Sequence, residues 1–463
     1  MTTSDFAALD EQKFKAFHWR ATLTTGLGVF CDGYDLTSVG LVMPEILAHF
    51  GHAKLTGLES ALLAASALAG AAIGGLGFGL LGQRGRKNFY GFDVLILGLA
   101  AIAQAFAPSV AALIAIRFIL GIGVGGDYVL SPMIMAEHSN RANRGRAIGL
   151  GFGTMWPLGA LAATLVDLAL KAIGVDPDLR WRLVLAGGAI PAFAVIYLRR
   201  TMPETARYLA RLGGKSDEAA NVIAQISGER TAAPTVDNRP FGQVLAQHAR
   251  PILAAALLWL IYDLVVYASI LFGPSLIAQS LGLNAINFNL VMYLFFTLPA
   301  SVLFSIFIID QFGRKPLQAW GFVAGAVAIG VFALLQRQLA AVPILALLVF
   351  GLFNVAATGP GLVSGGGILG VELAPTRVRS VAQSITVAGG RIGATLSTFA
   401  FPLLFGAIGR APTYWILAAL GVLGALLTWL LVPETGRISL EKITGEDVLG
   451  VGAPAETRSA SLA

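Results

Sequence analysis

Residues 110–136 read VAALIAIRFILGIGVGGDYVLSPMIMA, an apolar run interrupted by only two charged residues, Arg117 and Asp127. A helix of this length, rising about 1.5 Å per residue, crosses a hydrocarbon core of about 30 Å. A carboxylate inside such a run costs at least about 2.5 kcal/mol in a bilayer, so its presence indicates a functional role. The stretch predicts a membrane-spanning helix that takes part in handling protons or substrate.

Comparable apolar runs recur from one end of the chain to the other, and the composition is 56% hydrophobic and only 13% charged. Such a composition is typical of an integral membrane protein. The predicted fold class is an all-α membrane protein with about twelve transmembrane helices. They are predicted at 19–48, 56–81, 88–107, 110–136, 145–171, 181–199, 251–279, 287–309, 316–335, 341–366, 379–408 and 411–432.

Three short motifs occur twice, always 228 to 235 residues apart. The duplication predicts two pseudo-symmetric six-helix halves, with the substrate site between them near the bilayer midplane. The motifs are Gly-Arg-Lys at 85–87 and 313–315, a Glu seven residues before an Arg (Glu137 with Arg144, Glu372 with Arg379), and Pro-Glu-Thr at 203–205 and 433–435.

The predicted domains are two halves at 1–199 and 251–432, a polar loop at 200–250 and a tail at 433–463. Basic residues gather in alternate loops, so the positive-inside rule places both termini and the 200–250 loop in the cytoplasm. The net charge of +6 reflects this topology, and no interleaved basic and aromatic patch indicates a nucleic-acid partner. We expect a plasma membrane location, which in a bacterium is the inner membrane. No cleavable signal peptide is expected, because residues 1–18 lack an apolar core.

Other classes of site are not indicated. Cys31 is the only cysteine, which rules out an intrachain disulfide and a cysteine-based metal site. Residues 121–126 spell GxGxxG, but they lie inside a predicted span and follow no strand, so close helix packing is the better interpretation. The five histidines fall near span ends or in loops. We therefore expect no metal and no cofactor.

The loop at 310–315, Asp-Gln-Phe-Gly-Arg-Lys, resembles the signature of the major facilitator superfamily. There an Asp and an Arg clamp the cytoplasmic ends of neighbouring helices. The first-half copy departs from the pattern, because Gly82 stands where the Asp is expected. The resemblance implies a gate at the cytoplasmic span ends, formed by Arg86, Asp310, Arg314, Glu137, Arg144, Glu372 and Arg379.

The fourth span carries Gly-Gly-Asp-Tyr at 125–128, which resembles the phosphate:proton symporters. In the seventh span Trp259, Asp263 and Tyr267 share one helical face, because they are four residues apart. The resemblance implies that these three residues and Tyr128 hold phosphate. It also implies that Asp32 and Asp35 belong to the proton route, although aromatic-acid:proton symporters carry a similar first-span motif.

The fifth span departs from the resemblance. The phosphate symporters have a Gln there that contacts the anion, whereas residues 153–157 here read GTMWP. Thr154 can supply a hydroxyl, but a Trp and a Pro change the shape of the pocket. The substrate is therefore less firmly indicated than the superfamily.

Charge alone predicts coupling between protons and an anion. An anion would be repelled by ionised Asp263, whereas a protonated Asp263 or Asp127 becomes a hydrogen-bond donor. Proton and anion binding then depend on each other, which is the thermodynamic basis of symport. Arg391 in the eleventh span is expected to supply compensating positive charge. Arg117 is expected to lower the pKa of Asp127 or to release its proton.

Each of these residues also has a structural interpretation. Asp127 and Asp263 can form helix-holding ion pairs with Arg117 or Arg391, and Asp35 can cap or pair within the first span. Trp259 and Tyr267 can be packing aromatics.

The sequence predicts a proton-coupled secondary transporter, not an enzyme, that imports inorganic phosphate or a related small anion by alternating access. The alternatives are a symporter of the same fold for an organic (aromatic) acid or a sugar, and a non-transporting nutrient sensor. Its expected partners are the anion, protons and the lipid bilayer, and the expected working unit is a monomer.

Overall fold

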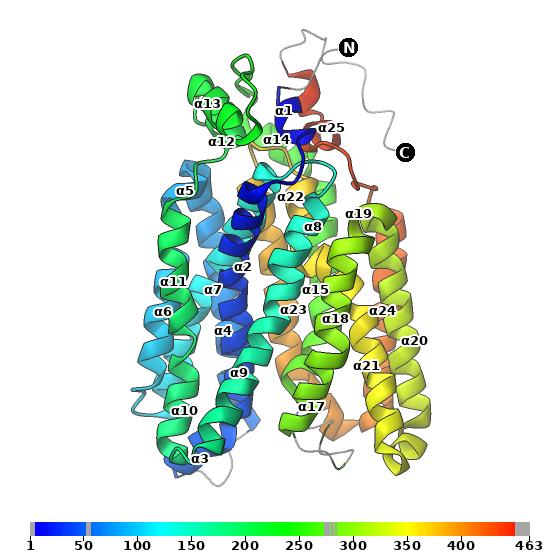
Figure 1. Cartoon of the computed structure of the whole chain (residues 1–463). Helices are drawn as coiled ribbons and strands as arrows, with labels where there is room; N and C mark the ends of the chain where they lie inside the picture. The colour runs from blue at the N-terminus through cyan, green and yellow to red at the C-terminus, as the bar shows by residue number, and fades with distance from the viewer. Residues whose placement is uncertain (1–4, 52–56, 273–277, 279–281, 283–284, 450–463) are drawn as a thin grey trace.

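The computed structural model describes residues 5–51, 57–272, 278, 282 and 285–449, and within these ranges the chain forms helices and no strands (Figure 1). The helices form an elongated bundle, with a smaller group of short helices at one end. Ten helical segments of the described part of the chain are long and apolar enough to cross a membrane. The prediction of an all-α membrane protein is confirmed.

Four of the ten segments lie in the first half, and the helices Ala16–Leu41 and Phe92–Gln104 lie where the sequence predicts its first and third spans. Its elements are α2 (Ala16–Leu41), α3 (Met43–His49), α4 (Gly57–Leu81), η1 (Gly82–Arg84), α5 (Arg86–Phe89), α6 (Phe92–Gln104), α7 (Val110–His138), α8 (Arg144–Ile148), η2 (Gly149–Thr154), α9 (Met155–Ala172), α10 (Pro177–Ala186) and α11 (Ala189–Arg200). The predicted run at 19–48 is divided between α2 and α3 at Val42, where Pro44 starts the new helix because it has no N–H for the old one.

The second half repeats this arrangement. Its elements are α15 (Ala249–Phe272), α17 (Ala285–Val291), η4 (Met292–Thr297), α18 (Leu298–Leu303), η5 (Phe304–Ile308), α19 (Ile309–Phe312), α20 (Arg314–Ala341), α21 (Pro343–Pro360), η6 (Gly361–Gly365), α22 (Ile368–Glu372), α23 (Arg379–Ala407) and α24 (Arg410–Leu431). The predicted run at 251–279 begins in α15 and continues into residues outside the described ranges.

Glycines let α4 and α7 approach closely. A Cβ at Gly121 would collide with the carbonyl oxygen of Ala67, and one at Gly125 with that of Ala71. These glycines belong to the GxGxxG string, so its interpretation as a helix-packing stripe is confirmed.

The short helices form a cap at the end of the bundle where both ends of the described chain lie (Figure 1). We call this the terminal end. Phe6 and Leu9 are fully buried there against Ala206 and Ile223. The cap contains α1 (Ala7–Asp10), α12 (Ala206–Arg211), α13 (Ser216–Ser227), α14 (Phe241–Gln247), α25 (Leu440–Thr444) and η7 (Glu446–Val448).

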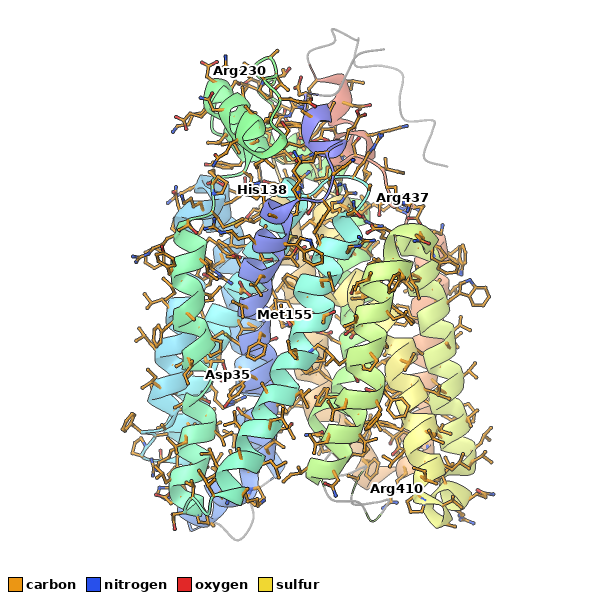
Figure 2. The ribbon with its side chains drawn as sticks, in the orientation of Figure 1. Asp35, His138, Met155, Arg230, Arg410 and Arg437 are labelled. Atoms are coloured by element: carbon orange, nitrogen blue, oxygen red, sulfur yellow. The ribbon has the colours of Figure 1, made fainter. Side chains whose placement is uncertain are left out.

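Charged side chains are concentrated at the two ends of the bundle, while its flanks are apolar. Figure 2 shows Arg437 near the terminal end and Arg410 at the opposite end, with Asp35 between them. Large apolar side chains such as Ile190 and Tyr197 are more than 70% exposed on the flanks. A soluble protein rarely exposes so much apolar surface, so the flanks fit contact with lipid tails.

Candidate functional site

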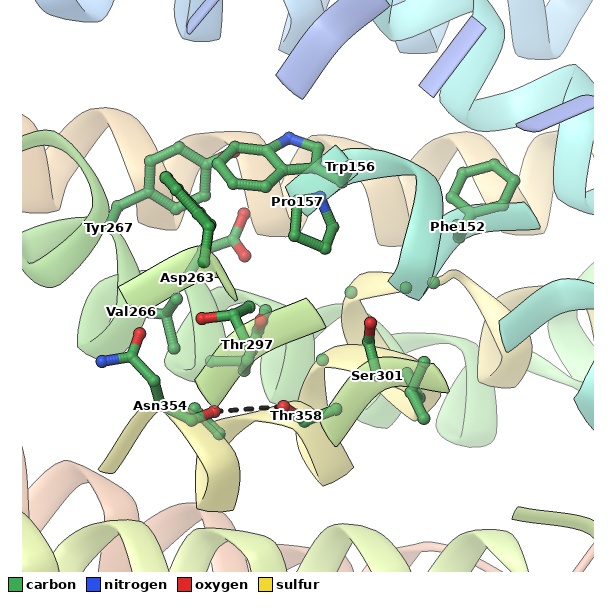
Figure 3. A pocket seen from close by; sticks show the side chains of 18 of the residues that line it. Phe152, Trp156, Pro157, Asp263, Val266, Tyr267, Thr297, Ser301, Asn354 and Thr358 are labelled. Atoms are coloured by element: carbon green, nitrogen blue, oxygen red, sulfur yellow. Dashed lines mark hydrogen bonds between the residues drawn. The ribbon is translucent and has the colours of Figure 1, made fainter. Parts of the chain in front are cut away.

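A cavity of about 970 Å³, measured with its open mouth, lies between the two halves. Figure 3 shows Tyr267, Asp263 and Trp156 on one side of it and Thr297, Ser301, Asn354 and Thr358 on the other. The first half contributes Val29, Tyr128, Phe152, Trp156 and Pro157, and the second contributes Asp263, Tyr267, Asn289, Tyr293, Asn354 and Arg391 among others.

Arg391 is the cationic group of the cavity lining. It donates a hydrogen bond to the hydroxyl of Tyr267 over 2.6 Å and forms an ion pair of 3.3 Å with Asp263. Its guanidinium lies 4.4 Å from the ring centre of Tyr128 and 5.8 Å from that of Trp259. A cation held between aromatic faces and a carboxylate is stabilised without water. The guanidinium is therefore presented to the cavity in a fixed position.

Four of the five predicted substrate residues therefore meet in the cavity lining: Tyr128, Asp263, Tyr267 and Arg391. Trp259 lies behind Arg391 and is not part of the lining. Gly390 makes this contact possible, because a Cβ there would press against the Trp259 indole.

Asp32 lies behind the first-half wall of the cavity and is only 1% exposed. Its Oδ2 accepts a hydrogen bond from the Tyr128 hydroxyl over 2.6 Å and another from the indole N–H of Trp156 over 2.9 Å. Its Oδ1 has no hydrogen-bond partner among the described residues. A Trp of the stretch that lacks the expected Gln thus contacts a carboxylate of the predicted proton route.

Asp35 and Arg117 are buried in the first half, away from the cavity lining. Neither carboxylate oxygen of Asp35 has a hydrogen-bond partner among the described residues. Arg117 donates to the carbonyl oxygen of Leu63 over 3.1 Å and to Gln104 over 3.0 Å. The expectation that Arg117 acts on Asp127 is wrong, because its guanidinium is directed toward α4 and α6.

Asp127 pairs instead with Arg199 at the end of α11. The guanidinium of Arg199 also pairs with Asp93, and it stacks 4.0 Å from the ring centre of Tyr90. Ser131 donates a 2.6 Å hydrogen bond to Asp127. None of these side chains lines the cavity, so Asp127 lies outside the cavity wall in this conformation.

The sequence interpretation missed Arg199 and Asp93. Arg199 precedes Arg200, and such a pair at a span end is typical of a basic cytoplasmic flank. Only Arg200 is exposed, whereas Arg199 is fully buried. The sequence signal that could have revealed a buried partner for Arg199 was Asp93, which lies about one turn into the predicted third span.

At the terminal end, the second-half loop makes a dense set of ionic contacts. Asp310 accepts from the backbone N–H groups of Gly145 and Arg146, over 3.0 and 2.7 Å, at the start of α8 in the other half. It also forms a 2.9 Å ion pair with Arg314. Glu372 pairs with Arg144 at 2.7 Å and Arg314 at 3.3 Å, and accepts from the hydroxyl of Thr435.

The first-half loop has the same contacts except those of the missing Asp. Glu137 pairs with Arg379 at 2.9 Å and Arg86 at 3.4 Å, and accepts from the hydroxyl of Thr205. Arg86 donates to the carbonyl oxygen of Gly82 over 2.7 Å and to that of Thr376, in the other half, over 3.0 Å. All seven predicted gate residues therefore lie in contacts at the terminal end.

Two of the repeated motifs bind each other. The Glu of each Pro-Glu-Thr accepts hydrogen bonds from the backbone N–H groups of the Gly-Arg-Lys motif in its own half. Glu434 accepts from Arg314 and Lys315, and Glu204 accepts from Lys87. The glycine of each triplet has a positive φ, which leaves the following N–H groups free to point at the carboxylate.

In the cap, Arg207 joins the two ends of the described chain. It pairs with Asp10 of α1 at 2.9 Å and with Glu441 of α25 at 2.7 Å. Burial raises the pKa of Asp10 to about 6, and the charge of Arg207 only partly opposes this. Burial also acts to raise the pKa of Glu441, but the guanidinium of Arg207 outweighs it and the pKa is lowered.

The chain is similar to known transport proteins in both sequence and fold. The profile of the family described as Sugar (and other) transporter matches residues 21–446. The probable inorganic phosphate transporter 1-6 of Arabidopsis thaliana is 31% identical over 95% of this chain and 96% of its own length. The probable inorganic phosphate transporter 1-10 of Oryza sativa subsp. japonica is 32% identical, over 94% and 91%.

Among solved structures, the major facilitator superfamily proton:xylose symporter XylE, bound to 6-bromo-6-deoxy-D-glucose, has a TM-score of 0.79. It is 26% identical, and the match covers 93% of this chain and 99% of that one. The inward open conformation of XylE from E. coli has a TM-score of 0.67 at 25% identity, over the same shares. With a family profile matched along most of its length and relatives above 30% identity, the chain belongs to the Sugar (and other) transporter family within the major facilitator superfamily, a family of multi-pass membrane transporters.

Proposed function

We propose that the protein is a proton-coupled secondary transporter that imports inorganic phosphate by alternating access. The observation that carries the proposal is Arg391, a cation in the wall of a cavity between the two halves, with the hydroxyl of Tyr267 and the ring of Tyr128 beside it. Cationic and neutral donors of this kind suit the oxygens of a small anion. Relatives named as inorganic phosphate transporters and a proton symporter of the same fold support it.

The ion pair between Arg391 and Asp263 supplies the coupling. In the empty site the charge of Arg391 is already balanced by Asp263, so a second anion would be repelled. A proton taken up by Asp263 leaves Arg391 with an uncompensated charge in a buried position. The anion then restores the balance, so each ligand increases the affinity for the other. Asp32, Asp35 and Asp127 are the further carboxylates of this proposed proton route, and Arg117 is a neighbouring charge.

We propose that the terminal end faces the cytoplasm and that its ionic contacts form the inner gate. Bonds between the halves, such as Arg144 to Glu372 and Arg379 to Glu137, hold that end closed. The higher TM-score against the sugar-bound XylE than against its inward open form agrees with a closed inner side. The proposed organisation is two halves at 1–199 and 251–432, a 200–250 loop and a 433–463 tail, working as a monomer in the lipid bilayer of a plasma membrane.

A second candidate is symport of an organic acid or a sugar. The cavity extends past Arg391 to Asn289, Asn354 and Thr358, whose amides and hydroxyl suit a larger polar substrate. The family profile itself includes sugar transporters.

The test is uptake of radiolabelled phosphate into proteoliposomes under an inward proton gradient. We expect saturable uptake that collapses with a protonophore and resists excess unlabelled benzoate or glucose. Competition by benzoate or glucose would instead establish the second candidate. Specific binding of phosphate without flux would support a sensor.

Asp263→Asn and Asp217→Asn make a matched pair for this assay, because each replaces one carboxylate and Asp217 is exposed on α13. Asp263→Asn is expected to lose gradient-driven accumulation while retaining phosphate exchange. Asp217→Asn is expected to behave as the wild type. Accumulation that survives in Asp263→Asn would contradict the proposed coupling.

A further inference from the structure

The indole of Trp156 occupies an unusual position for a cavity residue. Its ring belongs to the cavity lining, yet its only polar atom donates to Asp32, which is not part of the lining. Figure 3 shows the ring nitrogen of Trp156 on the side away from Asn354 and Thr358. The hydrogen-bonding group therefore serves the buried carboxylate, and the substrate meets only the ring.

The backbone around Trp156 is held in place by close helix packing. A Cβ at Gly33 would collide with the carbonyl oxygen of Trp156, and a Cβ at Gly159 would collide with that of Phe30. Helices α2 and α9 thus approach with backbone against backbone on both sides of Asp32. Such packing fixes the backbone of Trp156 relative to that of Asp32, and the 2.9 Å hydrogen bond forms between side chains attached to these two backbones.

Asp32 Oδ2 receives both of the hydrogen bonds made to this carboxylate. Because Tyr128 and Trp156 are both donors here, their bonds favour the ionised form of Asp32 over the protonated form. A proton that adds to the carboxylate from the aqueous phase removes its charge and weakens both bonds. The hydroxyl of Tyr128, which is part of the cavity lining, is then free to turn to an anion beside Arg391.

We propose that Trp156 is a positioning residue that sets the pH at which the transporter loads its anion, by stabilising the Asp32 carboxylate through the indole N–H. This inference rests on the proposed function as a proton-coupled phosphate transporter. It gives Trp156, in the stretch that lacks the expected Gln, a role in coupling and none in hydrogen bonding to phosphate.

Other charges also act on Asp32, and a test must hold them constant. Arg117 and Tyr128 face it from α7, Asp263 and Tyr267 from α15, and Arg391 from α23, while Cys31 and Asp35 lie on its own helix. Replacing Trp156 changes none of these groups. A shift in the pH response can therefore be assigned to the indole N–H.

The experiment measures phosphate uptake by proteoliposomes between external pH 5 and 8 for the wild type and Trp156→Phe. We expect the pH of half-maximal uptake to rise by about one unit in the variant, because the lost hydrogen bond had favoured the ionised carboxylate. At saturating acidity the half-saturating phosphate concentration should stay within about twofold of the wild type, since the indole N–H does not contact the anion. A residue that only fills space would lower the maximal rate and leave the pH midpoint unchanged.

Three further proteins make the result decisive. In the Asp32→Asn background, Trp156→Phe should cause no further pH shift, because no carboxylate remains to be stabilised. Benzothienylalanine at position 156 keeps the shape of the indole and removes only the N–H, so it should reproduce the shift even where Trp156→Phe folds poorly. Trp320→Phe, on the exposed surface of α20, is the matched control and should show none.

An unchanged midpoint in Trp156→Phe and in the benzothienylalanine protein would overturn the inference, as would a shift that persists with Asp32→Asn. A raised half-saturating concentration at an unchanged midpoint would also overturn it and would assign Trp156 to the anion. If the wild type neither accumulates nor exchanges phosphate, the proposed function itself fails, and this outcome is seen before any variant is tested.

Discussion

The two copies of the repeated loop, at 82–87 and 310–315, occupy equivalent places and yet hold the two halves together differently. In the second half, Asp310 reaches across to backbone N–H groups of α8. In the first half, a Cβ at Gly82 would collide with the hydroxyl of Ser380, and Ser380 itself donates to the carbonyl oxygen of Gly79 over 2.7 Å. At the position of the missing Asp, one copy thus joins the halves by charge and the other by close contact. A departure from a motif can therefore indicate a different kind of contact between the halves, and not only the loss of one.

The largest effect is expected from restoring the missing Asp. Gly82→Asp places a side chain where α4 and α23 touch, so the helices must separate around a buried carboxylate. We expect the closed conformation to be destabilised by about 4 kcal/mol and the Tm in detergent to fall clearly. Gly77→Ala, on the same helix with open space around its Cβ position, is the control. A variant as stable as the wild type would show that the two joints are interchangeable.

The opposite change, Asp310→Asn, removes the ionic joint. It weakens two hydrogen bonds to α8 and the ion pair with Arg314, at an expected cost of about 3 kcal/mol to the closed conformation. A thiol introduced by Ser305→Cys reports on opening, because Ser305 is fully buried beside Gly149. Its labelling rate should rise about a hundredfold, since each 1.4 kcal/mol is a factor of ten. Cys31 is buried and gives a low background, and unaltered labelling would contradict the role of Asp310.

A symmetric change should affect the two copies equally. Thr205 and Thr435 each donate to the Glu at the centre of one network, so Thr205→Val and Thr435→Val should each cost about 1.5 kcal/mol. The same labelling assay measures this. Their effects should add in the double variant, because the two networks share no residue. Strong coupling would mean that the two gate networks open as one unit.

The smallest effect is expected near the arginines that follow the two Pro-Glu-Thr motifs. Arg207 is buried, whereas Arg437 is exposed and has a φ of 59°. The pKa of Asp10 is raised to about 6 from an ordinary 3.8, so its stabilisation of the cap is present at low pH and lost as the pH rises through about 6. Glu441 has a lowered pKa, and its contribution is lost only when the pH falls below its ordinary 4.5.

Between pH 7 and 5, Asp10 is therefore the one of these two carboxyl groups whose protonation changes the stability of the cap. Hydrogen-exchange protection of α1, corrected for the intrinsic rate, should rise by up to about tenfold on acidification, or roughly 1 kcal/mol. Asp10→Asn should abolish this dependence, and Arg437→Gln should leave it intact. Protection that falls on acidification would contradict the assignment.

Much of the fold could be predicted because length, apolarity and repetition are properties of the sequence itself. Each of the twelve predicted runs overlaps a helix or a series of consecutive helices. The contacts of Trp259, Asp263 and Tyr267 with Arg391 could also be predicted, because three of these four residues lie on one helical face.

The remaining contacts depend on how each helix is rotated about its axis, which a single sequence does not specify. Arg117 was matched with Asp127 because they share a helix, but ten residues along a helix put them on different levels and in contact with different neighbours. Arg199 lies 72 residues after Asp127 in the sequence and meets it in space. The Trp156 contact with Asp32 likewise follows from the backbone approach of α2 and α9.

The bridge from Arg207 to Asp10 and Glu441 also bears on how the protein is made. The buried guanidinium needs one partner from the beginning of the chain and one from near its end, so the cap cannot close until the ribosome has passed residue 441. Until then Arg207 lacks one of its two carboxylates, and a buried cation left without a partner is costly. The cap thus requires that synthesis has reached α25, and nascent chains that stop before residue 441 should remain accessible to membrane proteases.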